Sequence, residues 1–465
     1  MNNRISPFSR LPFSILMIGC LLGALLVSAA GQGAAPEPSA VIDSASSEPA
    51  LIDIQDGRMT NTTGGQTIPE GTAAAWLARQ KSRVSPRDFD LLARAQATLL
   101  ANIGRPEDVS KLDTVGGRGI ASLGKPLPWS PLRGIYPSPF KYRGVWSWDG
   151  PFHALAVARW DPALAREQLT ILLDRQQPGG ALPDVVMEDG TVVTEFGKPP
   201  VLPWALRLVD DLAPDRAYLA EVYPKLAALE GHWMNNRGGR EDGLFHYGGG
   251  NPKFESGWDT SVRWDRGCDN LWAVDANCYM VMLYESMAAL AGRLGRPEDQ
   301  AKWRTRGEEL SRRIDQILWN EAAGSYMDRD RKTREFNDVL SPASFMPLYL
   351  KVAGRDHAER MAKMAADPAK FSPGLPSVSY DHSAFRSGDY WRGPTWLNVA
   401  YFALKGLKNY GFVSLAEGIR ETLLGWCDRN KDYLWEYYDS RTGQGLGAPQ
   451  YGWTGTFLIE LILNW

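Results

Sequence analysis

The sequence predicts an all-α protein folded as an (α/α)6 barrel, a toroid of six helical hairpins with long loops on one rim. Three observations lead to this prediction. Apolar residues beyond residue 72 recur at steps of three and four, whereas runs of alternating polar and apolar residues are almost absent. Short turns and long loops alternate along the chain. The stretch is also long enough for about twelve helices with ordinary connections.

The first 30 residues are typical of an export signal. Arg4 and Arg10 lie around the start of an apolar run from Leu11 to Val27, and small residues follow it. We expect residues 1–30 to be a signal peptide and the protein to be periplasmic or extracellular. The alternative is a membrane anchor formed by an uncleaved N-terminal segment, because the apolar run approaches the length of a bilayer span. Residues 31–70 are rich in Ala, Ser, Pro, Gly and Thr, which indicates a disordered linker.

Residues 71–465 are expected to form the catalytic domain, and its helices can be located in order. The apolar stripes are Leu219–Trp233, Met280–Leu294, Leu310–Ile317, Leu397–Leu407 and Leu415–Trp426. Pro214 and Pro297 stand beside acidic residues, which is a common signal for a helix start. Thr191–Thr194 is a short strand candidate.

Five long loops, rich in Gly, Trp, Tyr and Asp, separate the hairpins. They span residues 143–150, 178–203, 238–270, 371–396 and 433–454. In a toroid of helical hairpins such loops gather on one rim, so we expect the candidate active site there.

Charge and motif content exclude several classes of protein. The chain has 51 basic and 54 acidic residues and no basic run, which argues against a nucleic-acid partner. Nucleotide-binding and metal-binding motifs are absent, so no cofactor and no metal are expected. The spacing of Cys268 and Cys278 does not decide whether they form a disulfide, and the oligomeric state also stays open.

The loops repeat one chemical theme, a carboxylate beside Trp or Tyr. The theme occurs in Trp146–Asp149, Glu255–Asp265, Asp389–Trp396 and Leu434–Asp439. Glycoside hydrolysis uses two carboxyl groups, one held protonated and one ionised, together with surfaces that hold a sugar ring. The loops therefore point to a carbohydrate as the small-molecule substrate.

The runs Glu255–Asp265, Tyr390–Pro394 and Glu436–Gly443 resemble those of glycoside hydrolase family 63. The mannosylglycerate and glucosylglycerate hydrolases are the most similar branch, and trehalases and oligosaccharide α-glucosidases are related. The resemblance covers about residues 130–465. It implies an (α/α)6 barrel and an inverting glycosidase that acts on an α-glucoside or α-mannoside.

The resemblance also implies the catalytic roles. Asp259 matches the general acid, and Asp265 is the rival candidate for this role. The alternative for Asp259 is that it caps a helix. Glu436 matches the general base that activates water, and its alternative is a solvated acid before a turn. The two carboxyl groups of an inverting enzyme are expected about 6.5–9.5 Å apart.

Seven further residues are candidates for substrate binding. They are Trp148, Asp149, Lys198, Trp258, Tyr390, Trp391 and Trp396. Asp149 is equally well placed to cap a helix, since Pro151 follows it. Core packing is the alternative for the aromatic residues, and Arg392 is interpreted as structural. Lys198 stands where relatives often have Gln, which suggests either a different hydroxyl pattern or a cation facing an acidic aglycone.

Two other functions remain open at this point. One is a glycan-binding protein that has lost catalysis, which the presence of both carboxylates disfavours. The other is a polysaccharide lyase on an α/α barrel. A lyase would need a Tyr or His base near a cation, and this sequence shows no such arrangement. Sugar, linkage and aglycone depend on loop geometry, and the sequence leaves them undetermined.

Overall fold

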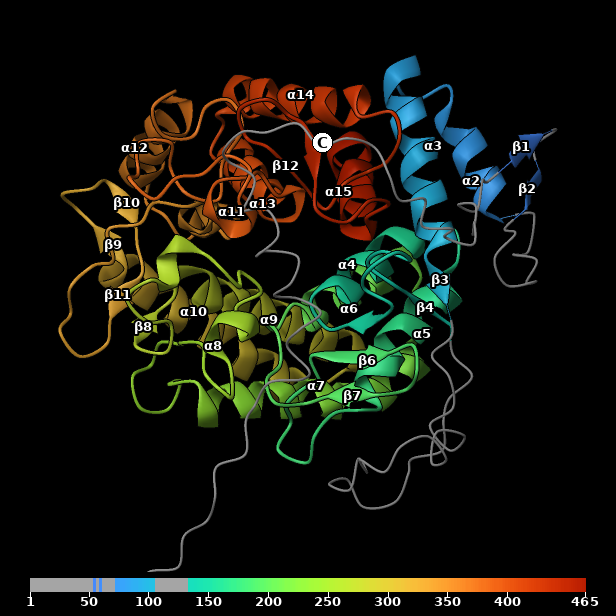
Figure 1. Ribbon diagram of the computed structural model, residues 1–465. Helices are drawn as coiled ribbons and strands as arrows, with labels where there is room; N and C mark the ends of the chain where they lie inside the picture. The colour runs from blue at the N-terminus through green and yellow to red at the C-terminus, as the bar shows by residue number, and fades with distance from the viewer. Residues whose placement is uncertain (1–52, 56–57, 61–71, 105–132) are drawn as a thin grey trace, which may run out of the picture. The chain divides into compact units, whose positions relative to one another are not determined.

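The computed structural model describes residues 53–55, 58–60, 72–104 and 133–465, and Figure 1 shows their arrangement. The expected signal peptide and most of the expected linker lie outside these residues. Within the described part of the chain, no helix is long and apolar enough to cross a membrane.

Six helices form a closed inner ring. They are α4 (Asp149–Val157), α6 (Leu202–Leu212), α9 (Val274–Leu294), α11 (Met346–Tyr349), α13 (Leu397–Asn409) and α15 (Gly452–Leu463). Each packs against the next in this order, and α15 packs against α4, which closes the ring (Figure 1). Every residue of α4 is buried, as expected for a helix covered on all sides.

The outer helices are amphipathic and cover this ring. They are α3 (Pro86–Ala101), α5 (Pro162–Leu173), α7 (Arg216–Asn236), α10 (Pro297–Ile317), α12 (Arg355–Ala366) and α14 (Val413–Arg429). Helix α5 packs on α4, α7 and α10 pack on α9, α14 packs on α13, and α3 packs on α15. The N-terminal α2 (Thr72–Gln80) lies against α3. The predicted (α/α)6 barrel is therefore confirmed, with α3 and α15 completing a pair from opposite ends of the chain.

The helix starts follow the predicted signals. Asp215 caps α7 by accepting a hydrogen bond from the Tyr218 amide at 3.0 Å, and α10 begins at Pro297. The predicted apolar stripes all fall within α7, α9, α10, α13 and α14.

Short antiparallel strands are confined to the connections. They are β1 (Asp53–Gln55) with β2 (Arg58–Thr60), β3 (Ile103–Gly104) with β4 (Gly134–Ile135), β8 (Leu271–Trp272) with β11 (Arg329–Asp330), and β9 (Trp319–Asn320) with β10 (Ser325–Tyr326). Strands β5 (Gly144–Trp146), β6 (Val185–Met187) and β7 (Val192–Val193) form one sheet, and β7 confirms the predicted strand at 191–194. Strand β12 (Tyr437–Tyr438) pairs with β13 (Gly445–Leu446).

Three short helical segments lie in the long loops near the candidate site. They are α8 (Pro252–Glu255) and the 3-10 turns η2 (Val262–Trp264) and η4 (Tyr390–Arg392); a further turn, η3 (Pro342–Phe345), precedes α11. Cys268, Cys278 and Cys427 are buried free thiols, so Cys268 and Cys278 do not pair.

Candidate active site

Asp259 is half-buried on the loop between α8 and η2. Its Oδ1 atom is shielded from solvent and has no hydrogen-bond partner. Burial raises the pKa of Asp259, while the Lys198 ammonium and the Tyr390 hydroxyl oppose this rise. A carboxyl group that resists ionisation is suited to donate a proton at neutral pH.

Glu436 lies just before β12 and is almost fully buried, with 1% of its surface exposed. Its Oε2 atom accepts a hydrogen bond from the Ala448 amide at 2.9 Å. Its Oε1 atom accepts from the hydroxyl groups of Tyr142 and Tyr390, both at 3.4 Å. Burial raises the pKa of Glu436 to about 7, and the nearby Asp259 contributes to the rise.

The Tyr390 hydroxyl connects the two carboxylates, because it interacts with Asp259 as well as with Glu436. The backbone of Tyr390 has a φ of 34°, a conformation that bulky residues rarely adopt. Its carbonyl accepts a hydrogen bond from the Trp396 indole at 3.2 Å. Such strain persists only where surrounding contacts hold the residue in place, and it concentrates at functional sites.

Asp149, Asp184 and Lys198 form a buried charged cluster beside Asp259. The Lys198 ammonium lies 3.5 Å from Asp184 and also donates to the Phe254 carbonyl. Burial raises the pKa of Asp149 to about 8 and that of Asp184 to about 6, and Lys198 lowers both. Asp149 does not cap α4; it accepts a hydrogen bond from the Tyr451 hydroxyl at 3.1 Å.

Several buried polar atoms on these loops have no hydrogen-bond partner. They are the indole nitrogens of Trp146, Trp148, Trp258 and Trp391 and the Oδ1 atom of Asp259, whereas Asp184 Oδ1 has its ion pair with Lys198. A buried polar atom without a partner is costly, so a set of donors and acceptors in one region indicates a ligand that supplies them. Sugar hydroxyl groups can both donate and accept.

The aromatic candidates are buried and packed against one another. Trp258 stacks on Trp391, Trp391 stacks on Trp396, and Trp148 packs edge-on against Phe152. Trp396 is 0% exposed and Trp391 is 1% exposed. Their predicted part in sugar binding therefore rests on edges and indole N–H groups rather than on open ring faces.

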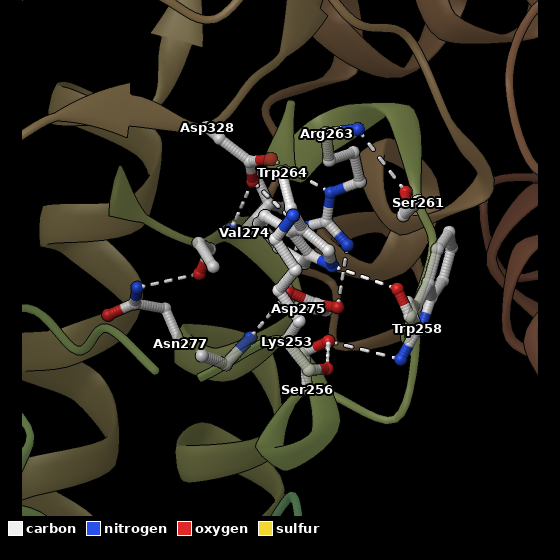
Figure 2. A network of polar contacts seen from close by, with 12 residues as sticks. Lys253, Ser256, Trp258, Ser261, Arg263, Trp264, Val274, Asp275, Asn277 and Asp328 are labelled. Atoms are coloured by element: carbon white, nitrogen blue, oxygen red, sulfur yellow. Dashed lines mark hydrogen bonds and ion pairs between the residues drawn. The ribbon is translucent and has the colours of Figure 1, made fainter. Parts of the chain in front are cut away.

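A buried ion network supports the loop that carries Asp259 (Figure 2). The Arg263 guanidinium makes paired hydrogen bonds of 2.8 Å to Asp275 and to Asp328. Its exposed fraction is 1%. The Trp264 indole donates to the Trp258 carbonyl at 3.0 Å, so the chain on both sides of Asp259 is held to this network.

Asp265 and Arg392 form an ion pair that bears on the choice between Asp259 and Asp265 as the general acid. Asp265, the rival to Asp259, makes paired hydrogen bonds to Arg392, which lowers its pKa. An ionised, half-exposed carboxylate is poorly suited to the role of a general acid. Arg392 is thereby occupied in a structural ion pair, as interpreted from the sequence.

The sequence prediction missed three residues of this site: Tyr142, Asp184 and Tyr451. Tyr142 and Tyr451 contact Glu436 and Asp149, from loops far apart in sequence. Asp184 lies in the Gly-rich loop 178–203, where a carboxylate after Pro183 and a lysine at 198 were the only signal. Among the described residues, no group of three or more potential ligands is arranged to hold a metal ion.

Paired buried carboxylates on one rim of an (α/α)6 barrel define the class, a glycoside hydrolase. Residues 142–454 match the mannosylglycerate hydrolase MGH1-like glycoside hydrolase domain, and the chain belongs to this family. It is an α-glycosidase related to family 63 enzymes and to trehalases. The lyase and glycan-binding alternatives receive no support.

Several characterised proteins are similar to this chain. A mannosylglycerate hydrolase of Rubrobacter radiotolerans is 25% identical over an alignment of 417 positions, which covers 70% of this chain and 92% of the relative. The Thermus thermophilus mannosylglycerate hydrolase is 26% identical, over 71% and 95% of the two chains. A crystal structure of a family 63 mannosylglycerate hydrolase from Thermus thermophilus, in complex with Tris, superposes with a TM-score of 0.65 and 24% identity, over 79% of this chain and 99% of that one.

Proposed function

We propose that the protein is an inverting α-glycosidase in which Asp259 is the general acid and Glu436 is the general base. The observation that carries this proposal is the convergence of two buried carboxyl groups of raised pKa on the Tyr390 hydroxyl. Asp259 protonates the departing glycosidic oxygen. Glu436 takes a proton from the water that attacks the anomeric carbon on the opposite face. The products are the free sugar and the aglycone alcohol.

Protonation states support this division of roles. Burial raises the pKa of Asp259, and its Oδ1 atom has no hydrogen-bond donor beside it, so its surroundings favour the protonated form. Glu436 is stabilised as an anion by the Ala448 amide and by the Tyr142 hydroxyl, which donate to the charged form. A base whose pKa is about 7 is matched to water activation near neutral pH.

The proposed substrate is an α-linked glucoside or mannoside, which can be a glycosylglycerate, a small disaccharide or an oligosaccharide. Relatives of this chain include mannosylglycerate hydrolases and periplasmic trehalases. Asp149, Asp184 and the indole N–H groups of Trp146 and Trp148 are the groups we propose to bind ring hydroxyls; neither indole N–H has a hydrogen-bond partner. The Lys198 charge is already engaged by Asp184 and a backbone carbonyl, which favours an altered hydroxyl pattern over a cation facing an acidic aglycone.

We propose the chain organisation that the sequence predicts: a signal peptide (1–30), a linker (31–70) and a catalytic domain (71–465). Export to the periplasm or the cell exterior fits the N-terminal pattern of basic, apolar and small residues. Mass spectrometry of the protein purified from cells would locate the mature N-terminus. A start near residue 31 is expected, and a retained residue 1 would indicate the membrane anchor instead.

Proton NMR tests the reaction and its substrate together. Residues 31–465 are incubated with glucosylglycerate, mannosylglycerate, trehalose and small α-gluco-oligosaccharides. Early appearance of the β-anomer of the released sugar is expected, because water attacks the face opposite the bond that breaks. Early α-anomer would mean retention, and Glu436 would then not act as a base on water.

Variants of the two carboxylates test their roles. Glu436→Gln and Asp259→Asn are each expected to lose about 10² to 10⁴ in rate while remaining folded. Glycosyl fluorides separate the roles, because fluoride departs without protonation. Asp259→Asn should retain much of its activity on α-glucosyl or α-mannosyl fluoride, whereas Glu436→Gln should lose it. Near-full activity of either variant on the O-glycoside would remove that residue from the mechanism.

A further inference from the structure

Four aromatic rings form a continuous stack between the loops that carry Asp259 and Glu436. We call this stack the ring column; its members are Trp258, Trp391, Trp396 and Tyr437. Ring centroids are 4.7 Å apart between Trp258 and Trp391, with planes at 21°. The Trp391 and Trp396 rings are parallel within 1° at 3.8 Å. Tyr437 continues the stack on Trp396 at 4.5 Å.

The two ends of the ring column are the sequence neighbours of the two candidate catalytic residues. Trp258 immediately precedes Asp259, and Tyr437 immediately follows Glu436. Tyr390 lies edge-on along the column, with centroids 5.1 Å from Trp396 and 5.5 Å from Tyr437. Its hydroxyl is the group that reaches both carboxylates. The column therefore joins the loops of both carboxylates and packs against the tyrosine whose hydroxyl reaches both.

Hydrogen bonds join the same three loops in the same order. The Trp391 amide donates to Thr260 Oγ1 at 3.4 Å, next to Asp259. Thr395 and Tyr438 exchange backbone hydrogen bonds of 2.8 and 3.0 Å, two residues beyond Glu436. The loop of the middle rings is thus tied to the acid loop at one end and to the base loop at the other.

One end of the ring column is fixed by the buried ion network. The Arg263 guanidinium carbon lies 5.0 Å from the Trp258 ring centroid and 4.3 Å from that of Trp264 (Figure 2). Asp275, on α9, and Asp328 hold the guanidinium in two planar ion pairs. Because arginine can pair with carboxylates and stack on rings at once, this contact ties the column to the inner ring of helices.

We propose that the ring column is a positioning device that fixes the separation of Asp259 and Glu436. Inverting hydrolysis needs a defined gap between acid and base that admits one water molecule and the sugar. Buried stacked rings cannot shift without losing packing, and the inner two rings are 1% and 0% exposed. This proposal rests on the proposed function, since it assigns a task only if these two carboxylates catalyse the reaction.

Trp391→Leu tests the proposal, because it removes the stack at its centre while keeping an apolar side chain. We expect kcat on the O-glycoside to fall about 100-fold with KM changed less than about threefold, since a displacement of about 1 Å can cost that much. Trp391→Phe retains a ring and should recover most of the loss. On the glycosyl fluoride, which needs only the base and water, the loss should be clearly smaller.

Trp303→Leu is the matched control. Trp303 on α10 is equally buried and stacks on Tyr284 at 6.1 Å, but it lies outside the column. Its variant should lose thermal stability while kcat stays within about twofold of wild type. If Trp391→Leu does not fold, Tyr437→Leu and Tyr437→Phe test the half-buried end of the column in the same way, with the phenylalanine variant expected to retain kcat.

Three outcomes would overturn the proposal. If Trp391→Leu loses stability as Trp303→Leu does but keeps its kcat, the Trp391 ring has a purely structural role. A rise in KM at constant kcat would show a direct contact with the sugar. Equal losses on O-glycoside and fluoride would show that the acid–base separation is not what changed. Failure of the proposed function appears separately, as activity that survives Glu436→Gln and Asp259→Asn.

Discussion

Replacing Lys198 by glutamine removes one positive charge from among three buried carboxylates. The Lys198 side chain is 8% exposed and its ammonium lies 3.5 Å from Asp184. At an effective dielectric constant of about 20, a charge pair at this distance interacts by about 5 kcal/mol, an upper bound. The same charge lowers the pKa of Asp259, Asp184 and Asp149. For Glu436, Lys141 is the lysine among the main causes that lower the pKa.

The direction of the pH effect follows from these contacts. Loss of the Lys198 charge raises the pKa of Asp259, so the proposed general acid keeps its proton to higher pH. The alkaline limb of kcat/KM should therefore move to higher pH. The acidic limb, which reports ionisation of Glu436, should stay in place.

The assay is the pH profile of kcat/KM on the substrate that NMR identifies. Lys225→Gln is the control, because it breaks a lysine–aspartate pair with Asp174 away from the site. The double variant Lys198→Gln/Asp184→Asn removes both charges and should return the limb towards wild type. An alkaline limb that coincides with wild type in Lys198→Gln would refute the electrostatic reasoning, even if the melting temperature changed.

Three more perturbations probe the same contacts. Because burial raises the pKa of Glu436 to about 7 and the base must be ionised, kcat/KM of the wild type should fall about tenfold per unit as the pH drops below 7; a flat profile from pH 7 to 5 would contradict this. Burial raises the pKa of Asp149 to about 8, so the folded state loses stability as the pH rises from about 4 to 8. Chemical unfolding should therefore show that Asp149→Asn raises the free energy of unfolding by a few kcal/mol at pH 8 and by almost nothing at pH 4. Gly447→Ala should lower kcat/KM about 100-fold, because a Cβ there would lie 2.6 Å from Glu436 Oε2. Gly411→Ala, with a similar positive φ but open space around it, should lose only about 1–2 kcal/mol of stability and keep its activity.

The barrel could be predicted from the sequence because its signals are local. Each apolar stripe, such as Leu219–Trp233, is visible within one helix, and each start signal, such as Asp215, lies beside the helix it begins. Pairing of α3 with α15 was not predictable in this way. It depends on closure of the ring, which joins residues more than 300 positions apart.

The candidate carboxylates were accessible to sequence reasoning, whereas their environment was not. Asp259 and Glu436 stand in recognisable motifs, but Tyr142 and Tyr451 reach Glu436 and Asp149 only because distant loops meet on one rim. Asp184 shows the same limit. Its neighbours in sequence are unremarkable, and only the fold places it beside Lys198.

The tryptophans show how a correct motif can leave its physical role undetermined. Trp391 and Trp396 are prominent in the sequence because they stand beside a carboxylate, which suggests a sugar platform. In the fold their faces are covered by one another, so an open platform is no longer their main property. A ring that binds sugar needs an exposed face, whereas a ring that positions its neighbours within the ring column needs both faces covered. The burial of the ring faces, which no sequence pattern reports, therefore favours the positioning role that we propose for the ring column.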